Sequence, residues 1–273
     1  MRVLLCTCAK NENNYILEWV EHNKKLGFDN IVIYDNNDID GERFDDILKE
    51  YIESGYVIIK DVRGKECIQI PSFDDCYQTL AKDYDWVCFI DIDEFIEIDN
   101  NLTIKEFISQ PKFKSFNSIC LCWKLFDDNN LIEVKDNNYS IKRFTHFTNK
   151  NSNQVKRIVK TNIDATVNSS HTFVDKDYLG NINKKVRDNV KSCNTLGKST
   201  TNSVTIKNNT WESARINHYR FKTLEEYITN KAPKGYATAW KNKGKDYLTL
   251  NTFFKFNAKT KEKIKWLKDK GII

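Results

Sequence analysis

The stretch from Trp86 to Phe95, with the sequence WVCFIDIDEF, constrains the fold most strongly. Its first five residues are apolar, and aromatic or β-branched residues among them are typical of a buried strand. Charged side chains are almost never fully buried unless they are paired, so this strand must reach the surface at Asp91. Because Asp91 and Asp93 are separated by one residue, both carboxylates point the same way from an extended segment. The sequence therefore predicts a buried strand with an acidic cluster at its carboxyl end.

Paired carboxylates in this position predict half of a binding site for a hard divalent cation, Mn²⁺ or Mg²⁺, which prefers oxygen ligands. A site with so few protein ligands must be completed by its substrate, and phosphate oxygens are the usual donors. Taken alone, an Asp-x-Asp sequence is more often a solvated acidic loop after a core strand. The rest of the chain has to decide between the two.

Strand-like and helix-like segments alternate through the first 95 residues. We expect strands over 3–8, 30–34, 56–59 and 86–90, and helices over 11–26, 44–51 and 72–83. This spacing is typical of βαβ units in an α/β fold with a mostly parallel sheet, whose right-handed crossovers bring all strand ends to one rim. The rim would carry Thr7–Glu12, Asp35–Asp38 and Asp91–Glu94. No Gly-x-Gly-x-x-Gly follows the first strand and no P-loop is present, which disfavours a Rossmann dehydrogenase.

The second half is less regular. We expect a short helix over 103–108, an apolar strand over 118–126 that runs into Asp127 and Asp128, and a basic strand over 154–160. Residues 181–210 are rich in Asn, Lys, Ser and Thr and predict a long loop, either a lid or a disordered insertion. A helix-like segment spans 222–240.

The tail from Lys259 to Lys270 carries six lysines around Ile264, Trp266 and Leu267. It either packs its tryptophan on the domain or lies as an amphipathic helix on anionic lipid.

Composition narrows the class of protein. The 273 residues suit one large α/β domain, or one domain with a smaller appendage. A net charge of +5 is compatible with anionic substrates or a membrane surface but does not favour nucleic acid. Five of the eight cysteines lie in apolar strand-like segments, which predicts buried, reduced thiols. We find neither a signal peptide nor an apolar run of the ~18–20 residues that a membrane span needs, so we expect a cytoplasmic protein, in peripheral membrane contact if the tail binds lipid.

Several short motifs occur in a characteristic order. They are Cys8–Glu12 followed by Tyr15–Trp19, Tyr34–Asn37, Trp86–Phe95, Lys156–Val159, Asn168–His171, and Asn217–Tyr219 leading to Leu224–Tyr227 and Lys231. This ordered set resembles family-92-like and family-2-like glycosyltransferases over about residues 3–240. The sequence departs from the family in two places: Lys234-Gly235 stands where the family usually has Arg-Gly, and residues 181–210 look expanded.

The resemblance implies a Rossmann-like fold of the GT-A type. Residues 1–240 would form the catalytic domain, with a nucleotide-binding half over 1–100 and an acceptor half over 101–240, followed by a basic helical tail over 241–273. It also implies a metal-dependent hexosyltransferase that uses a nucleotide sugar, with Mn²⁺ or Mg²⁺ stabilising the diphosphate as it leaves. The acceptor would be a glycan or a lipid-linked molecule.

The resemblance also implies roles for the acidic residues. Asp93 would ligate the metal directly, Asp91 would contact the ribose or the metal through water, and Glu94 would orient the acceptor or anchor the loop. His218 is the best further metal ligand, since imidazole binds transition ions such as Mn²⁺. His171 is a weaker candidate, for the acceptor pocket or the metal.

The donor would lie on the rim. Thr7, Lys10 and Glu12 would contact the base and ribose, and Asp35 could accept a hydrogen bond from the imide N–H of uracil. Lys156 and its neighbour Arg157 either bind phosphate or lie on a solvated basic strand. Arg215, Tyr219, Arg220 and Lys222, around His218, could hold the diphosphate.

An inverting transfer needs a carboxylate that takes the proton of the acceptor hydroxyl. Asp127 and Asp128 follow a strand end and could serve, with Asp128 preferred, although adjacent acids there are also a turn signal. Inversion itself rests on the resemblance alone.

Three functions therefore compete. The first is transfer of a hexose from a uridine-diphosphate donor to a glycan or lipid-linked acceptor. The second is an inactive module that binds a nucleotide or a glycan, and the third is a nucleotidyltransferase that uses the paired aspartates for two metals. No triphosphate-binding loop rich in Gly and Arg supports the third.

Overall fold

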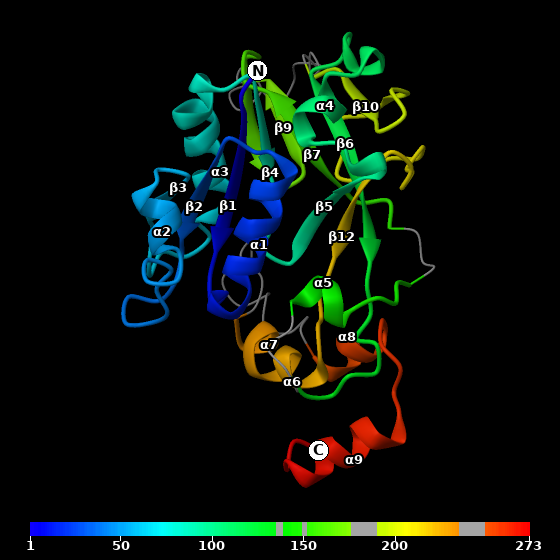
Figure 1. Ribbon diagram of the computed structural model, residues 1–273. Helices are drawn as coiled ribbons and strands as arrows, with labels where there is room; N and C mark the ends of the chain where they lie inside the picture. The colour runs from blue at the N-terminus through cyan, green and yellow to red at the C-terminus, as the bar shows by residue number, and fades with distance from the viewer. Residues whose placement is uncertain (135–138, 149–151, 176–189, 235–248) are drawn as a thin grey trace, which may run out of the picture.

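A large mixed sheet forms the centre of the molecule (Figure 1), and its main path has the strand order β11-β10-β6-β7-β4-β1-β2-β3. The computed structural model describes residues 1–134, 139–148, 152–175, 190–234 and 249–273. The strands of the first half are β1 Val3–Ala9, β2 Asn30–Asp35, β3 Val57–Asp61, β4 Trp86–Phe89 and β5 Glu94–Ile98. Those of the second half are β6 Ser118–Leu125, β7 Val155–Lys160, β8 Ala165–Ser169, β9 Thr172–Asp175, β10 Ser192–Asn194, β11 Ser199–Thr200 and β12 Ala214–His218.

The α-helices of the first half are α1 Asn13–Leu26, α2 Lys49–Glu53, α3 Gln69–Gln78 and α4 Ile104–Ile108. Those that follow are α5 Ser140–Arg143, α6 Leu224–Glu226, α7 Ala232–Lys234, α8 Leu250–Phe254 and α9 Lys261–Asp269. A π-helix over Tyr227–Lys231 joins α6 to α7.

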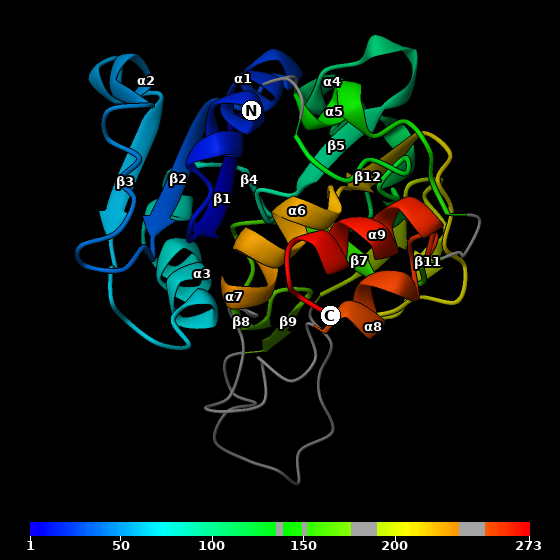
Figure 2. The same cartoon turned by 90° about the horizontal axis from the view of Figure 1, so that it is seen from below.

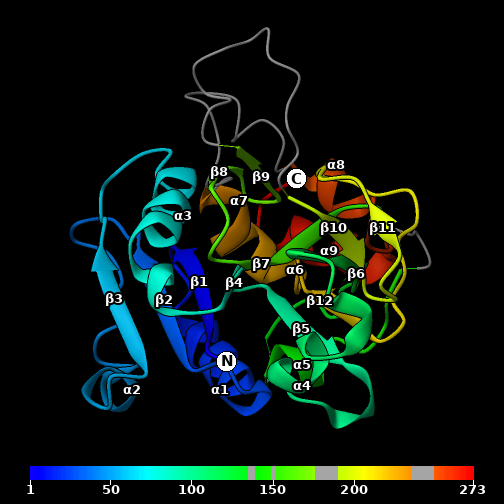
Figure 3. The ribbon, with the colours of Figure 1, turned by 90° about the horizontal axis from the view of Figure 1, so that it is seen from above.

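Strands β1 to β4 are parallel to one another in space, with β1 between β2 and β4. Alternate residues of β1 face opposite sides, so Leu5 packs in one core with Trp19 of α1, whereas Leu4 packs in a second core with Phe73 of α3. Figure 3 shows α1 and α3 on opposite faces of these strands. Helix α1 ends at Gly27, whose φ of 97° is readily adopted only by glycine. The predicted α/β class with a mostly parallel central sheet is confirmed.

The second half adds strands of both directions. Strand β7 is antiparallel to β4 and β6, and β12 is parallel to β6, so β6 and β12 run in the same direction as β4. The carboxyl end of β12, at His218, therefore lies at the same rim as the end of β4. Strand β5 pairs antiparallel with β12 and sets His218 opposite Glu94. The sequence did not predict β5, because its apolar residues directly continue the acidic cluster.

Three expectations for the second half need correction. The basic strand over 154–160 is not solvated: Lys156 and Arg157 of β7 are buried. The helix over 222–240 is broken into α6, the π-helix and α7 as far as Lys234, and 235–240 lie outside the described residues.

The loop expected over 181–210 is in part the edge of the sheet. Residues 181–189 lie outside the described part of the chain, but from Val190 onward β10 pairs with β6 and β11. Ser192, Asn194 and Thr195 are buried there. Apolar periodicity did not reveal this strand, because these side chains are polar. They can be buried because they hydrogen-bond to Arg157 and to backbone groups inside the fold.

The basic tail packs on the domain. Leu267 of α9 joins a small core with Phe221, Leu224 and Phe253, and Trp266 packs against it while its Nε1–H donates to Glu133 at 2.7 Å. Figure 2 shows α6, α7 and α9 across the end of the molecule that carries the strand carboxyl ends. The domain thus covers the apolar side of α9. No helix in the described ranges combines the length and apolarity that crossing a bilayer requires.

A buried ion pair fastens this tail. Lys263 of α9 pairs with Asp128, and both side chains are almost fully buried. The amide of Asp128 donates to Asn257 Oδ1 at 2.9 Å, so two residues of the tail hold the turn that follows β6.

We expect Lys263→Met to lower the free energy of unfolding by about 3–5 kcal/mol, because it leaves the Asp128 carboxylate buried without a partner. Urea unfolding at neutral pH measures this. The exposed Lys265→Met is the matched control and should change stability by less than about 0.5 kcal/mol. The double variant Asp128→Asn/Lys263→Met should recover part of the loss. Equal stability of the Lys263 and Lys265 variants would contradict the assignment.

Candidate active site

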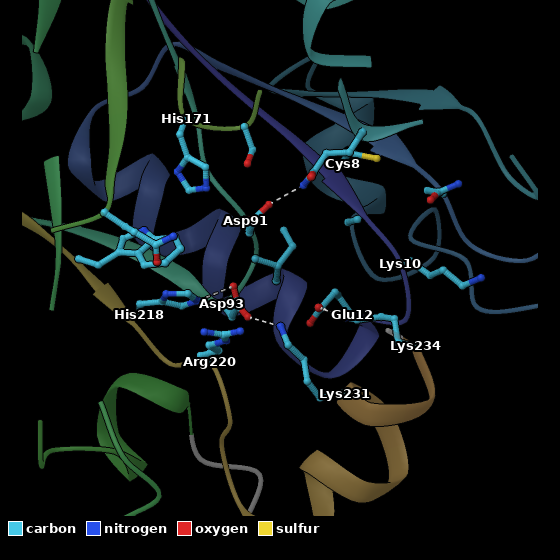
Figure 4. A pocket seen from close by; sticks show the side chains of 17 residues that line it. Cys8, Lys10, Glu12, Asp91, Asp93, His171, His218, Arg220, Lys231 and Lys234 are labelled. Atoms are coloured by element: carbon cyan, nitrogen blue, oxygen red, sulfur yellow. Dashed lines mark hydrogen bonds and ion pairs between the residues drawn. The ribbon is translucent and has the colours of Figure 1, made fainter. Parts of the chain in front are cut away.

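A pocket of about 290 Å³ opens at the carboxyl ends of β1, β4 and β12 (Figure 4). Its volume is near the lower end of the range for small-molecule sites. Seventeen of the described residues line it, and they come from the ends of β1, β2, β4 and β12 and the segments that follow them, from α3, β6, the residue before β7 and the β8–β9 turn, and from the segment around α7. The convergence of strand ends that the βαβ pattern predicted is therefore present.

Asp93 is an acidic residue of the pocket whose carboxylate has two side-chain partners. Its side chain is buried, Lys231 Nζ lies 2.6 Å from Oδ2, and His218 Nε2 lies 3.4 Å from Oδ1. The amide of Tyr219 also donates to the Asp93 carbonyl at 2.8 Å, which joins the end of β12 to the acidic cluster. Although burial alone would raise the pKa of Asp93, the Lys231 ammonium and His218 hold that pKa well below its usual range.

His218 is neutral at physiological pH. Burial lowers its pKa below the ordinary value, even though Asp93 acts in the opposite direction. Its Nδ1 is buried and has no hydrogen-bond partner among the residues that the structure describes. A neutral imidazole beside a carboxylate oxygen offers one nitrogen and one oxygen donor to a cation.

Asp91 has both carboxylate oxygens engaged. Oδ1 accepts from Gln69 Nε2 at 2.8 Å and Oδ2 accepts from Lys156 Nζ at 2.9 Å. Lys156 is fully buried and also lies 3.5 Å from Glu94 Oε2. Burial opposes ionisation of Asp91, but the Lys156 ammonium outweighs it and lowers the pKa of this carboxyl.

Glu94 anchors the acidic loop. It is fully buried, does not line the pocket, and its Oε2 accepts from the Asp91 amide at 2.9 Å. Of the two predicted roles, anchoring is the one that its position supports. Burial raises its pKa to about 8, against the effect of Lys156.

Cations surround the deep part of the pocket. Lys10, Arg220, Lys231 and Lys234 line it together with the carboxylates of Glu12, Asp91 and Asp93. Glu12 pairs with Lys234, and Lys222 lies 4.0 Å from its other oxygen. Lys156, Lys222 and Glu94 lie behind the lining residues, so among the described residues cations outnumber carboxylates around the pocket. Such a surface suits a ligand with several negative charges.

The structure brings Lys10, Glu12, Asp91, Asp93 and His218 together at the pocket. Thr7 and Asp35 are buried beside it and do not line it. The Asp35 carboxylate accepts from the Asn37 amide at 3.0 Å within its own turn. In this structure Thr7 and Asp35 therefore support the shape of the rim, and neither is among the residues that line the pocket.

The structure does not bring Asp127 and Asp128 to the pocket. Asp128 is buried against Lys263, and the Asp127 carboxylate accepts from the Asn129 amide at 2.9 Å. The turn interpretation of this acidic pair fits its position, and the expectation that Asp128 is the catalytic base needs correction.

Sequence reasoning missed Gln69, Trp123, Gln154 and Ser170 in the lining. Trp123 lies inside an apolar strand and looked like an ordinary core residue. Gln69 has no motif around it, and Gln154 opens the predicted basic strand but lies outside the Lys156–Val159 motif. Only Ser170 stood in a segment that the ordered motifs had singled out.

A family comparison agrees with this geometry. The family model described as glycosyltransferase family 92 matches residues 2–232. The chain belongs to glycosyltransferase family 92. The match ends within α7, so it includes every lining residue named above except Lys234.

Family 92 relatives occur in plants. A family 92 protein of Oryza sativa subsp. japonica is 27% identical over 120 residues, which are 42% of this chain and 20% of the relative. One of Ricinus communis is 28% identical over 102 residues, or 37% of this chain and 18% of the relative. One of Arabidopsis thaliana is 30% identical over 95 residues, or 33% of this chain and 16% of the relative. The matched segments span a fifth or less of these family 92 relatives.

Among solved structures, S. aureus TarS 1-349 in complex with UDP-GlcNAc is 15% identical, with 59% of this family 92 chain and 46% of that TarS 1-349 chain covered and a TM-score of 0.39. The complex of TarS 1-349 with UDP gives the same identity and TM-score.

We expect Glu94→Gln to make stability less sensitive to pH. In the folded protein the pKa of Glu94 is raised from 4.5 to about 8, so the folded state favours the protonated form. This contribution is complete below the unfolded pKa and is lost as pH rises towards the folded one. The free energy of unfolding of the wild type, relative to the variant, should therefore fall by up to about 1.4 kcal/mol per pH unit within that window.

Urea unfolding of both proteins at several pH values between these two pKa values gives the result. The exposed Glu66→Gln is the control and should track the wild type. A difference between wild type and Glu94→Gln that does not change with pH would show that Glu94 is ionised in the fold.

Proposed function

We propose that this chain is a metal-dependent glycosyltransferase that moves a hexose from a uridine-diphosphate sugar to a glycan or lipid-linked acceptor, with inversion. One observation carries the proposal: Asp93 lies between the neutral His218 imidazole and the Lys231 ammonium in a pocket with an excess of cations. Membership of glycosyltransferase family 92 supports the class of reaction.

The residues present fit a divalent cation. Lys231 holds one oxygen of Asp93, which leaves Oδ1 for a metal. His218 Nε2, 3.4 Å from Oδ1, would join it as a ligand with the proton of the neutral imidazole on Nδ1, which is buried and has no hydrogen-bond partner among the described residues. Within the described ranges no third His, Cys, Asp or Glu joins this pair as a metal-binding group. Diphosphate and water would supply the other ligands of Mn²⁺ or Mg²⁺. When bound, the cation supplies positive charge that stabilises the leaving diphosphate.

The chain's own cations bind the same leaving group. Lys231, Arg220 and Lys234 line the pocket beside Asp93 and offer N–H donors to phosphate oxygens. Their charge favours the diphosphate more as the bond to the sugar breaks and negative charge grows on its oxygens. Asp91, held by Lys156 and Gln69, is a fixed acceptor for a ribose hydroxyl rather than a direct metal ligand.

The rim after β2 supports uracil as the base. Asn36 lines the pocket, and its Nδ2 donates to the carbonyls of Val62 and Lys65 at 3.2 and 2.8 Å. Its Oδ1 remains as an acceptor, which suits the imide N–H of uracil. We therefore assign to Asn36 the contact that the sequence had predicted for its neighbour Asp35.

We expect Asp93→Asn to weaken manganese-dependent binding of uridine diphosphate by at least ~100-fold and to abolish transfer, because the cation loses its charged ligand. Isothermal titration calorimetry with Mn²⁺ and uridine diphosphate measures the binding, and nucleotide release from uridine-diphosphate hexoses measures the turnover. The exposed Asp269→Asn is the matched control and should behave as the wild type.

Two results would overturn the proposal. One is an Asp93→Asn protein that binds uridine diphosphate and Mn²⁺ as tightly as the wild type. The other is a wild-type protein that binds both but releases no nucleotide from any uridine-diphosphate hexose, which would make the chain a binding module.

A further inference from the structure

The wall of the pocket away from the cations has a different chemistry. Trp123 of β6, Gln154, and Ser170 and His171 of the β8–β9 turn line it. Figure 4 shows His171 across the pocket from Lys231 and Lys234, with the acidic cluster between them. As far as the described residues go, this wall carries hydrogen-bonding groups and an aromatic ring but no charged side chain, which is the character expected for a neutral, hydroxyl-rich ligand.

His171 is fixed in one tautomer. Its Nδ1 lies 2.8 Å from the Val155 carbonyl oxygen, which can only accept, so Nδ1 carries the proton. Nε2 is then the unprotonated nitrogen, with a lone pair. Burial and the nearby Lys156 ammonium lower the pKa of His171 to about 4, whereas Asp91 acts in the opposite direction and His218 adds to the lowering.

The ring is held rigidly. Arg157 Nε donates to the His171 carbonyl at 2.7 Å, and the His171 amide donates to Ser169 Oγ at 3.1 Å. The imidazole also packs edge-on against Trp123, with ring centroids 5.3 Å apart. A group held at its backbone, at Nδ1 and at its face keeps Nε2 in one position, as a proton acceptor in catalysis requires.

The carboxylates of the pocket are all engaged elsewhere. Glu12 pairs with Lys234, Asp91 with Lys156, and Asp93 with Lys231. Glu12 and Asp93 lie beside the cations that would hold the leaving group, and both oxygens of Asp91 are held by Gln69 and Lys156. An inverting displacement needs its base on the side of the sugar opposite the leaving group, and His171 lies across the pocket from Lys231 and Lys234.

Trp123 provides the surface for a sugar ring. Its side chain lies between His171 and His218, with centroid distances of 5.3 and 4.4 Å. Its indole Nε1 is buried and has no acceptor among the described residues, and a sugar hydroxyl would supply one. Such an amphipathic ring, apolar on its face and polar at one edge, suits a carbohydrate.

We infer that Trp123, Gln154, Ser170 and His171 form the subsite for the acceptor sugar, and that Nε2 of His171 takes the proton of the attacking hydroxyl. This inference rests on the proposed glycosyltransferase function. In the step, the acceptor O–H proton moves to Nε2 and the oxygen forms a bond to the anomeric carbon. The bond from that carbon to the phosphate oxygen breaks, and its electron pair leaves with the nucleoside diphosphate.

His171→Asn tests the base. The asparagine amide nitrogen takes the place of Nδ1 and keeps a donor for the Val155 carbonyl, while the variant has no Nε2. We expect turnover of uridine-diphosphate hexoses with methyl hexopyranosides as acceptors to fall by about 10²–10⁴-fold, with the affinity for uridine diphosphate within about twofold of the wild type. The exposed His146→Asn is the matched control and should keep wild-type turnover.

Each outcome decides the inference. Turnover of His171→Asn within about twofold of the wild type would overturn it, and so would a parallel loss of nucleotide affinity, which would place His171 in the donor site. A wild type without turnover would instead overturn the proposed function. Nitrogen-15 NMR of the wild type reads the tautomer without any variant, and a protonated Nε2 at neutral pH would also overturn the inference.

Discussion

Two lysines from distant parts of the chain neutralise the acidic cluster, and the rest of the site depends on this pairing. Lys156 comes from β7 and Lys231 from the π-helix, and each lies within hydrogen-bonding distance of one aspartate. A buried carboxylate such as that of Asp93 is costly unless it is paired, and Lys156 also holds Asp91, whose side chain is 34% exposed, so the cluster at the end of β4 depends on both lysines. The fold of the second half of the chain brings both lysines to the acidic cluster. The stability of that cluster, which lies in the first half, therefore depends on how the second half folds.

The two pairings leave the aspartates with different chemistry. Asp91 has both oxygens engaged and acts as a fixed acceptor, whereas Asp93 keeps one oxygen beside the imidazole of His218. The register of β12 on β5 sets this imidazole opposite Glu94, and Glu94 in turn holds the amide of Asp91. A change in that register would move His218 off Asp93. Strand pairing therefore positions the candidate metal ligands as much as the motif itself does.

The sequence predicted the parts of the site that lie on regular βαβ units. The apolar run before Asp91, the glycine after α1 and the alternation of strands and helices were enough to predict the rim and the convergence of Glu12, Asp91 and Asp93 on it. It also picked out His218, through the ordered motifs rather than through periodicity.

The sequence predictions failed where contacts between residues far apart in the sequence, and not the local pattern of residue types, determine the structure. Lys156 and Arg157 look like a solvated strand because their partners lie far away in sequence. The polar strand β10 has no apolar periodicity because Arg157 satisfies part of it inside the fold. Asp128 looked like a base at a strand end, but Lys263, from the tail, turns it into a structural ion pair. In each case the sequence shows the residue itself but does not show which residue is its partner in the fold.

The central claim is that a divalent cation binds between Asp93 and His218 and joins them to a diphosphate. Anomalous diffraction at the manganese edge, from crystals soaked with Mn²⁺ and uridine diphosphate, tests it most directly. The account predicts one strong peak in contact with Asp93 Oδ1, His218 Nε2 and diphosphate oxygens. Bound uridine diphosphate with no manganese peak beside Asp93 would contradict it.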